Sequence, residues 1–85
     1  MKYRVEVIAS AKKSLKNIEP QYVKKILQRI DLLQIDPRHH GSIKLSGQEN
    51  IYRTRVGKYR IIYEIHDTQV LVLVVQIDYR KDVYR

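Results

Sequence analysis

A run of twelve residues beginning at Tyr52 constrains the fold more than any other part of the chain. It reads Tyr-Arg-Thr-Arg-Val-Gly-Lys-Tyr-Arg-Ile-Ile-Tyr, with β-branched and aromatic residues on both sides of Gly57 and Lys58. Glycine at the first central position of a two-residue loop is typical of a type II′ turn, which joins two antiparallel strands. The run therefore predicts a β-hairpin with strands over 51–56 and 59–66.

The two-residue turn also predicts which residues lie opposite each other in the hairpin. Arg55 is then opposite Arg60 and Arg53 is opposite Ile62, and because side chains alternate between faces, the three arginines share one face. A three-residue loop would move one strand's side chains to the other face and would expose its apolar residues, so the shorter turn is favoured. We assign the opposite face to the core: Tyr52, Thr54, Val56, Tyr59, Ile61, Tyr63 and Ile65.

Like charges that face each other across a sheet repel, so the arginine face needs an explanation. For any one of these arginines, a solvated surface position is the simpler interpretation. Three at paired positions favour a site for an anion, since dispersed charges would cost less free energy. A phosphate group suits such a site, because the planar guanidinium can donate two parallel hydrogen bonds to it.

The first third of the chain predicts one strand and one helix. Residues 3–7 alternate apolar and charged side chains, which is typical of a half-buried strand. After Ala9 the period becomes helical: Ala11, Leu15 and Ile18 share a face, and Ser10 is the expected N-cap.

A second helix is predicted from Pro20 to the residue before Pro37. Proline suits the first turn of a helix, and the residue that precedes a proline is pushed out of the helical region. The expected apolar stripe of this helix consists of Val23, Ile26, Leu27, Ile30 and Leu33.

After a polar loop over 38–50, in which Ile43 and Leu45 can form a short extended piece, the hairpin is followed by an apolar run over 70–77. Its odd-numbered and even-numbered residues are both mostly apolar, so both faces of the strand are apolar, which indicates a central strand. Its Leu71, Leu73 and Val75 need a cover, either the chain's own tail or another protein. The order β-α-α-β-β-β predicts a single α+β domain over 1–85, with two N-terminal helices packed on one face of a small, mainly antiparallel sheet.

Composition limits the partners and the compartment. The chain carries 17 basic and 9 acidic residues, a net charge of +8, and this excess is spread along its length. RNA, DNA, an anionic membrane surface and an acidic protein are all compatible with it. The chain has no cysteine and its N-terminus lacks an apolar signal-like stretch, so we expect a cytoplasmic protein.

Three segments resemble the RelE/ParE superfamily of toxin–antitoxin toxins: Lys44-Leu-Ser-Gly, the run from Tyr52 to Ile65, and the ending Tyr79-Arg-Lys-Asp-Val-Tyr. The ending resembles the RelE branch, whose toxins cleave mRNA in the ribosomal A site. The ParE branch, which inhibits gyrase, shares the hairpin but lacks the full basic set and the closing tyrosine. The resemblance implies a ribosome-dependent mRNA endonuclease without a metal or cofactor, neutralised by an acidic antitoxin encoded beside it.

The resemblance also implies a set of catalytic residues, namely Arg53, Arg55, Arg60, Arg80 and Tyr84. RelE carries lysines where this chain has the first two arginines, and arginine stays protonated, so these two clamp phosphate and are not general bases. Arg80 would stabilise or protonate the leaving 5′-oxygen. Tyr84 would stack on a base or accept the 2′-OH proton. We further expect four residues to contact RNA: Lys44, Lys58, Lys81 and Arg85.

Other chemistries and functions have weaker support. His39 and His40 do not have the spacing of a helical metal pair, and we interpret them as solvated. His66 lies two residues after Glu64 on the same strand face and is a second candidate base, since some RelE-like relatives use histidine. Two alternative functions are a ParE-like gyrase inhibitor without catalysis and a toxin homologue that binds RNA without cleaving it.

Overall fold

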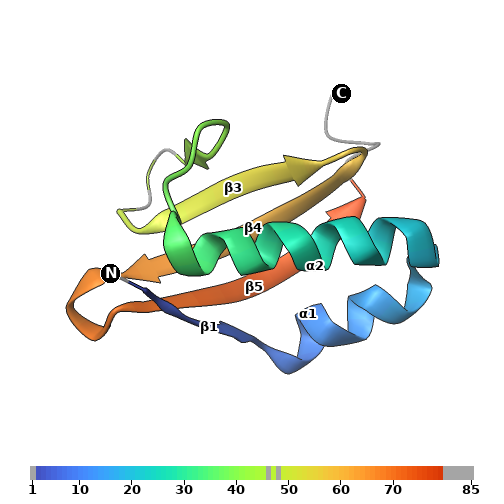
Figure 1. Cartoon of the computed structure of the whole chain (residues 1–85), viewed down its shortest axis with the longest axis horizontal. Helices are drawn as coiled ribbons and strands as arrows, with labels where there is room; N and C mark the ends of the chain where they lie inside the picture. Colours follow the sequence, from blue (N-terminus) through green and yellow to red (C-terminus); the bar gives the residue numbers. More distant parts are fainter. Residues whose placement is uncertain (1, 46, 48, 80–85) are drawn as a thin grey trace.

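Two helices lie across one face of a five-stranded sheet (Figure 1). The computed structural model describes residues 2–45, 47 and 49–79. Its elements are, in order, β1 (Arg4–Val7), α1 (Ala9–Ser14), the 3-10 turn η1 (Leu15–Asn17), α2 (Pro20–Ile35), β2 (Ile43–Lys44), β3 (Ile51–Val56), β4 (Tyr59–His66), the 3-10 turn η2 (Asp67–Gln69) and β5 (Leu71–Tyr79). The predicted α+β class and the predicted element order are confirmed. Within the described ranges, no helix is long and apolar enough to cross a membrane.

The sheet has the strand order β1-β5-β4-β3-β2. Its pairs are antiparallel except for β1 and β5, which are parallel and bring the first and last strands side by side. β5 lies between β1 and β4, as its apolar run predicted. β2 pairs only with Tyr52 and Arg53, so it covers the first half of β3 and leaves the second half without a neighbouring strand among the described residues.

The hairpin has the predicted register. Arg55 is paired with Arg60 and Arg53 with Ile62, and the two strands are joined through Gly57 and Lys58. Gly57 has a φ of 58°, in the left-handed region that favours glycine. The residues assigned to the core are buried or half-buried against the helices, with Ile61 and Tyr63 fully buried.

Two details of the helices differ from the prediction. The first helix starts directly after β1 at Ala9, and Ile8 occupies the N-cap position without a side-chain hydrogen bond, so Ser10 is not the cap. Leu27 is 47% exposed and does not belong to the buried stripe of α2. It follows Ile26, which is fully buried, and one residue turns a helix by about 100°, so Leu27 leaves the face that meets the sheet.

β5 contains an irregularity that changes which side chains share a face. The register against β4 shifts so that Ile62 is opposite Gln76 whereas Tyr63 is opposite Val74, which leaves Val75 as the extra residue of a β-bulge. Ile77 is therefore buried in the core with Val74. Strict alternation along β5 would place Asp78 there instead, and the bulge moves Asp78 to the opposite face.

Candidate nucleic-acid interface

The face of the sheet that is turned away from α1 and α2, which we call the outer face, carries the predicted arginine cluster. Arg53 and Arg55 come from β3 and Arg60 comes from β4. The side chains of Arg53 and Arg60 are half-buried, and that of Arg55 is exposed. Directly opposite residues in a sheet have Cβ atoms about 5 Å apart, so the side chains of Arg55 and Arg60 leave the backbone close to each other.

Arg60 has a carboxylate partner that the sequence did not reveal. Its Nε donates to Asp78 Oδ1 at 3.1 Å and its Nη2 to Asp78 Oδ2 at 3.0 Å, and the two side chains are only 23% and 30% exposed. Gln76 Nε2 also donates to Asp78 Oδ2. The β5 bulge produces this pair, because only the shifted register places Asp78 beside Arg60. A phosphate that binds Arg60 has to compete with Asp78.

A second pair on the outer face joins the candidate base His66 to Glu64. His66 Nε2 lies 2.8 Å from Glu64 Oε1, and both side chains are about 70% covered, with exposures of 30% and 27%. A carboxylate that holds an imidazole is the arrangement by which enzymes orient a histidine base. The prediction that His39 and His40 are both solvated is wrong for His39. This residue is only 7% exposed, and its Nδ1 lies 2.9 Å from the carbonyl oxygen of His40.

The other predicted site residues lie elsewhere or outside the described part. Lys44 is paired with Tyr52, a residue of the helix-covered face, so the structure does not bring Lys44 to the arginines. Lys58 lies at the hairpin turn, with its ammonium 5.6 Å and 5.7 Å from the ring centres of Tyr22 and Tyr79. Four predicted residues lie outside the described residues: Arg80, Lys81, Tyr84 and Arg85.

Arg29 on α2 is a further basic residue near the cluster, and sequence reasoning missed it. Its Nη1 donates to the hydroxyl of Thr54 at 2.6 Å and to the carbonyl oxygen of Arg55 at 2.9 Å. Both acceptors belong to the half of β3 that β2 leaves uncovered. Thr54 is fully buried, and a buried hydroxyl needs a hydrogen-bond partner. A threonine among the core-facing residues of the hairpin was therefore the sequence signal that a polar side chain from another element contacts this strand.

The helical layer carries half of the chain's net charge of +8. Residues 9–35, which form α1, η1 and α2, contain six basic and two acidic residues, a surplus of four. On the outer face two arginines have acidic partners, since Arg4 pairs with Glu6 at 3.1 Å and Arg60 pairs with Asp78. The charge excess thus extends beyond the arginine cluster and over the helices.

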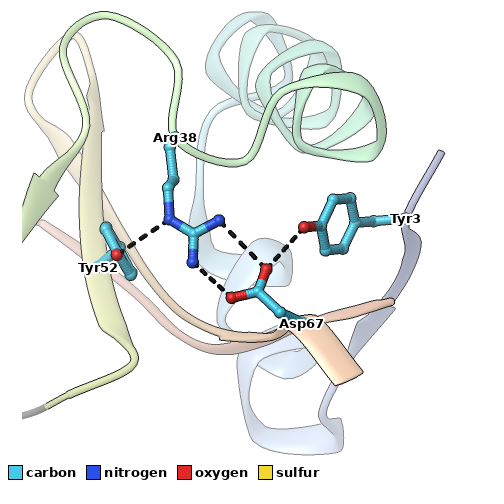
Figure 2. A network of polar contacts seen from close by, with 4 residues as sticks. All are labelled: Tyr3, Arg38, Tyr52 and Asp67. Atoms are coloured by element: carbon cyan, nitrogen blue, oxygen red, sulfur yellow. Dashed lines mark hydrogen bonds and ion pairs between the residues drawn. The ribbon is translucent and has the colours of Figure 1, made fainter. Parts of the chain in front are cut away.

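A polar network joins the loop after α2 to β3 and to η2, the turn between β4 and β5 (Figure 2). Arg38 donates through Nη2 to Asp67 Oδ2 at 2.7 Å and through Nη1 to Oδ1 at 3.2 Å. Its Nε donates to the hydroxyl of Tyr52 at 3.1 Å, and the Tyr3 hydroxyl donates to Asp67 Oδ1 at 2.7 Å. The network links the N-terminus, the loop, β3 and η2, so we assign it a structural role.

The network predicts that stability falls in acid. The hydrogen bond from Arg38 lowers the pKa of Asp67 from 3.8 to about 2. A lowered folded-state pKa stabilises the fold above the unfolded value, and this contribution is lost as the pH falls from about 4 to about 2. Asp67→Asn should therefore lower the melting temperature at pH 7, and its difference from the wild type should shrink near pH 2. Asp31→Asn, on the exposed side of α2, is the control. An Asp67→Asn effect that is the same at both pH values would contradict the assignment.

The arrangement of helices and strands places the chain in a known class. A helical hairpin packed on one face of a mainly antiparallel sheet is also the fold of the archaeal RelE of Pyrococcus horikoshii, which was solved in complex with RelB. The two proteins superpose with a TM-score of 0.86 over 96% of this chain and 99% of that chain, at 26% identity. The described domain therefore has the RelE-like toxin fold.

The family follows from the sequence comparisons. Residues 3–84 match the family model described as the ParE toxin of the type II toxin–antitoxin system parDE, and the chain belongs to this family. It is 31% identical to the RelE1 protein of Methanocaldococcus jannaschii over all of this chain and 98% of that protein. It is 26% identical to toxin RelG of Mycobacterium tuberculosis over all of this chain and 99% of that protein. The predicted RelE/ParE superfamily is confirmed.

Proposed function

We propose that this RelE-like toxin acts as an endonuclease that cleaves mRNA on the ribosome and so inhibits translation in the cytoplasm. The observation that carries the proposal is the arginine cluster of Arg53, Arg55 and Arg60 on one sheet face, in a chain of this toxin family. Fixed cations beside a phosphate stabilise the charge that develops when the phosphate is attacked. Production of the toxin should give codon-phased cuts in cellular mRNA, which primer extension detects.

The proposed reaction uses the substrate's own nucleophile. The 2′-OH attacks the adjacent 3′-phosphate, the bond from phosphorus to the 5′-oxygen breaks, and the products are a 2′,3′-cyclic phosphate and a 5′-hydroxyl end. The arginines of β3 and β4 bind the phosphate oxygens and stabilise the additional negative charge of the transition state. Two proton transfers complete the reaction: one from the 2′-OH and one to the 5′-oxygen.

Residues near the end of the chain are proposed to move these protons. Arg80 stabilises or protonates the leaving oxygen, and Tyr84 accepts the 2′-OH proton or stacks on a base. Both assignments rest on the resemblance of the ending to RelE. The pair of Glu64 and His66 is a second source of a base, because its imidazole is already held by a carboxylate on the arginine-bearing face.

Asp78 is expected to weaken substrate binding by occupying Arg60. Asp78→Asn should tighten binding of a 2′-O-methyl RNA, which cannot be cleaved, and should steepen the salt dependence of log K by about 0.7 for one additional phosphate contact. The matched control is Glu6→Gln, which removes an acidic partner from Arg4 on the same face. Fluorescence anisotropy over a salt series measures both. Equal changes in the two variants would show a general charge effect and no role for Asp78.

An alternative function is inhibition of gyrase without catalysis. The observation that favours it is the description of the matching family model as a ParE toxin. DNA damage and loss of supercoiling activity, in cells whose mRNA stays uncut, would select this function. Cuts phased with codons would select the endonuclease.

We infer an acidic antitoxin as the protein partner, because the similar Pyrococcus horikoshii toxin was solved with RelB. Leu71 and Leu73 are half-buried on the outer face, opposite His66 and Glu64 of β4, the strand that also carries Arg60. One partner segment that follows β4 can therefore cover both charged and apolar side chains. The double variant Arg55→Glu and Arg60→Glu should weaken a complex with the antitoxin encoded beside this chain at least tenfold, as measured by titration calorimetry. An unchanged dissociation constant would exclude the arginine cluster as the main contact.

A further inference from the structure

A basic hollow opens at the edge of the molecule between α2 and the end of β3. Its volume is about 420 Å³, and it is lined by Lys25, Gln28, Arg29, Arg55, Val56 and Gly57. Three of these six residues carry a positive charge, and the described lining contains no acidic side chain. A concave site lined by cations lowers the free energy of an anion more than the same cations dispersed on a flat surface do.

Arg29 is fixed in position as part of the wall of this hollow. Its two hydrogen bonds to Thr54 and to the Arg55 carbonyl both use Nη1. A guanidinium carries five N–H donors, so those two bonds leave the Nε and Nη2 donors for other acceptors. A cation that is already held loses little side-chain entropy when it binds an anion.

Arg55 connects the hollow to the arginine cluster. It lines the hollow and also belongs to the outer face, where it is opposite Arg60. The strand edge between the two places has no neighbouring strand among the described residues, since β2 pairs with β3 only as far as Arg53. A basic path therefore runs from the outer face, around the uncovered end of β3, to Lys25 on α2.

We propose that this hollow binds a backbone phosphate of an RNA strand whose neighbouring nucleotides lie on the arginine cluster. The proposal rests on the proposed function for the identity of the polyanion, but it requires binding and no cleavage. A polyanionic chain fits the path better than a single small anion, because the cations extend from the outer face of the sheet to α2 on the opposite face. The surplus of four positive charges on the helical layer attracts the same strand.

The test compares two neighbouring lysines of α2. Lys25 lines the hollow, and Lys24 is also exposed but does not line it. Lys25→Gln and Lys24→Gln remove the same charge one residue apart. The probe is a fluorescent 2′-O-methyl oligouridylate of about twelve nucleotides, which is long enough to follow the path. It cannot be cleaved, because the methyl group blocks the 2′-OH that acts as the nucleophile. Anisotropy is measured from about 0.05 to 1 M NaCl, because phosphate contacts appear as salt dependence.

The proposal predicts that Lys25→Gln reduces the salt slope by about 0.7, the value for one phosphate contact with a single strand, whereas Lys24→Gln leaves the slope unchanged. If the Lys25→Gln variant and the wild type bind equally at 1 M salt, this difference in slope makes the variant's affinity about fivefold weaker than that of the wild type at 0.1 M. Gln28→Glu, which adds a carboxylate to the lining, should weaken binding further. Equal slopes for the two lysine variants, or no binding of the probe by the wild type at low salt, would overturn the proposal.

The outcomes separate this inference from the proposed function. A toxin that leaves mRNA intact but shows the Lys25-specific slope supports the hollow and contradicts the endonuclease. Cleavage of mRNA, together with equal salt slopes for the two lysine variants, supports the endonuclease and contradicts phosphate binding in the hollow. A Lys25→Gln variant that loses affinity for the antitoxin while its RNA slope is unchanged would assign the hollow to the protein partner and overturn the inference.

Discussion

Arg55→Ala is expected to lower the rate of mRNA cleavage on the ribosome by about 100- to 1,000-fold, the usual cost of losing one preorganised group that stabilises transition-state charge. Arg55 lies opposite Arg60, and its side chain is exposed on the outer face. Arg55→Lys should retain part of the rate, because lysine keeps the charge but not the paired donors. Single-turnover cleavage of a programmed ribosome complex measures these rates.

Arg4→Ala is the matched control for this loss. Arg4 is an exposed arginine of the same sheet, but it lies on β1, which is separated from β4 by β5. Its removal changes the net charge by the same amount, so it reports the general electrostatic contribution. The proposed site would be wrong if the Arg4 and Arg55 alanine variants cleaved at rates within about threefold of each other.

Ile61→Ala is expected to destabilise the fold by about 2–5 kcal/mol, whereas Ile62→Ala should cost about 1 kcal/mol or less. Ile61 is fully buried against the helices, and Ile62 is half-buried on the outer face. The pair is sharply matched because the residues are identical and adjacent. Urea unfolding of the two variants gives both free energies through the linear dependence on denaturant.

This comparison also tests the register on which the arginine cluster depends. A shift of one residue in β4 would move Ile62 into the core and would turn Arg60 toward the helices. Equal destabilisation by the two variants, or a larger cost for Ile62→Ala, would contradict the register. The cluster would then lose its structural basis, whatever the cleavage assay showed.

The hairpin was predictable in detail because local chemistry determines it. Gly57 specifies the turn, and the turn length specifies which residues of the two strands are paired. The pairing of Arg55 with Arg60 then follows from alternation alone. The end of α2 was predictable for a similar reason, since Pro37 excludes the helical region for the residue before it.

The partners of the arginines were not predictable, since they depend on long-range geometry. Asp78 reaches Arg60 only because β5 contains a bulge at Val75, and this apolar run of similar residues has no turn chemistry that marks one. Arg29 reaches Thr54 from a helix 25 residues away in the sequence, and spacing within α2 cannot show which strand it meets. The roles of Arg80 and Tyr84 stay predictions from the resemblance.

The most direct test of the account is cleavage of a defined mRNA on purified ribosomes that carry a known codon in the A site. We expect a cut within that codon, a 2′,3′-cyclic phosphate at the new 3′ end, no cut in the same mRNA without ribosomes, and loss of the cut with Arg55→Ala. An mRNA that stays intact on the ribosome, together with inhibition of gyrase supercoiling by the same protein preparation, would contradict it.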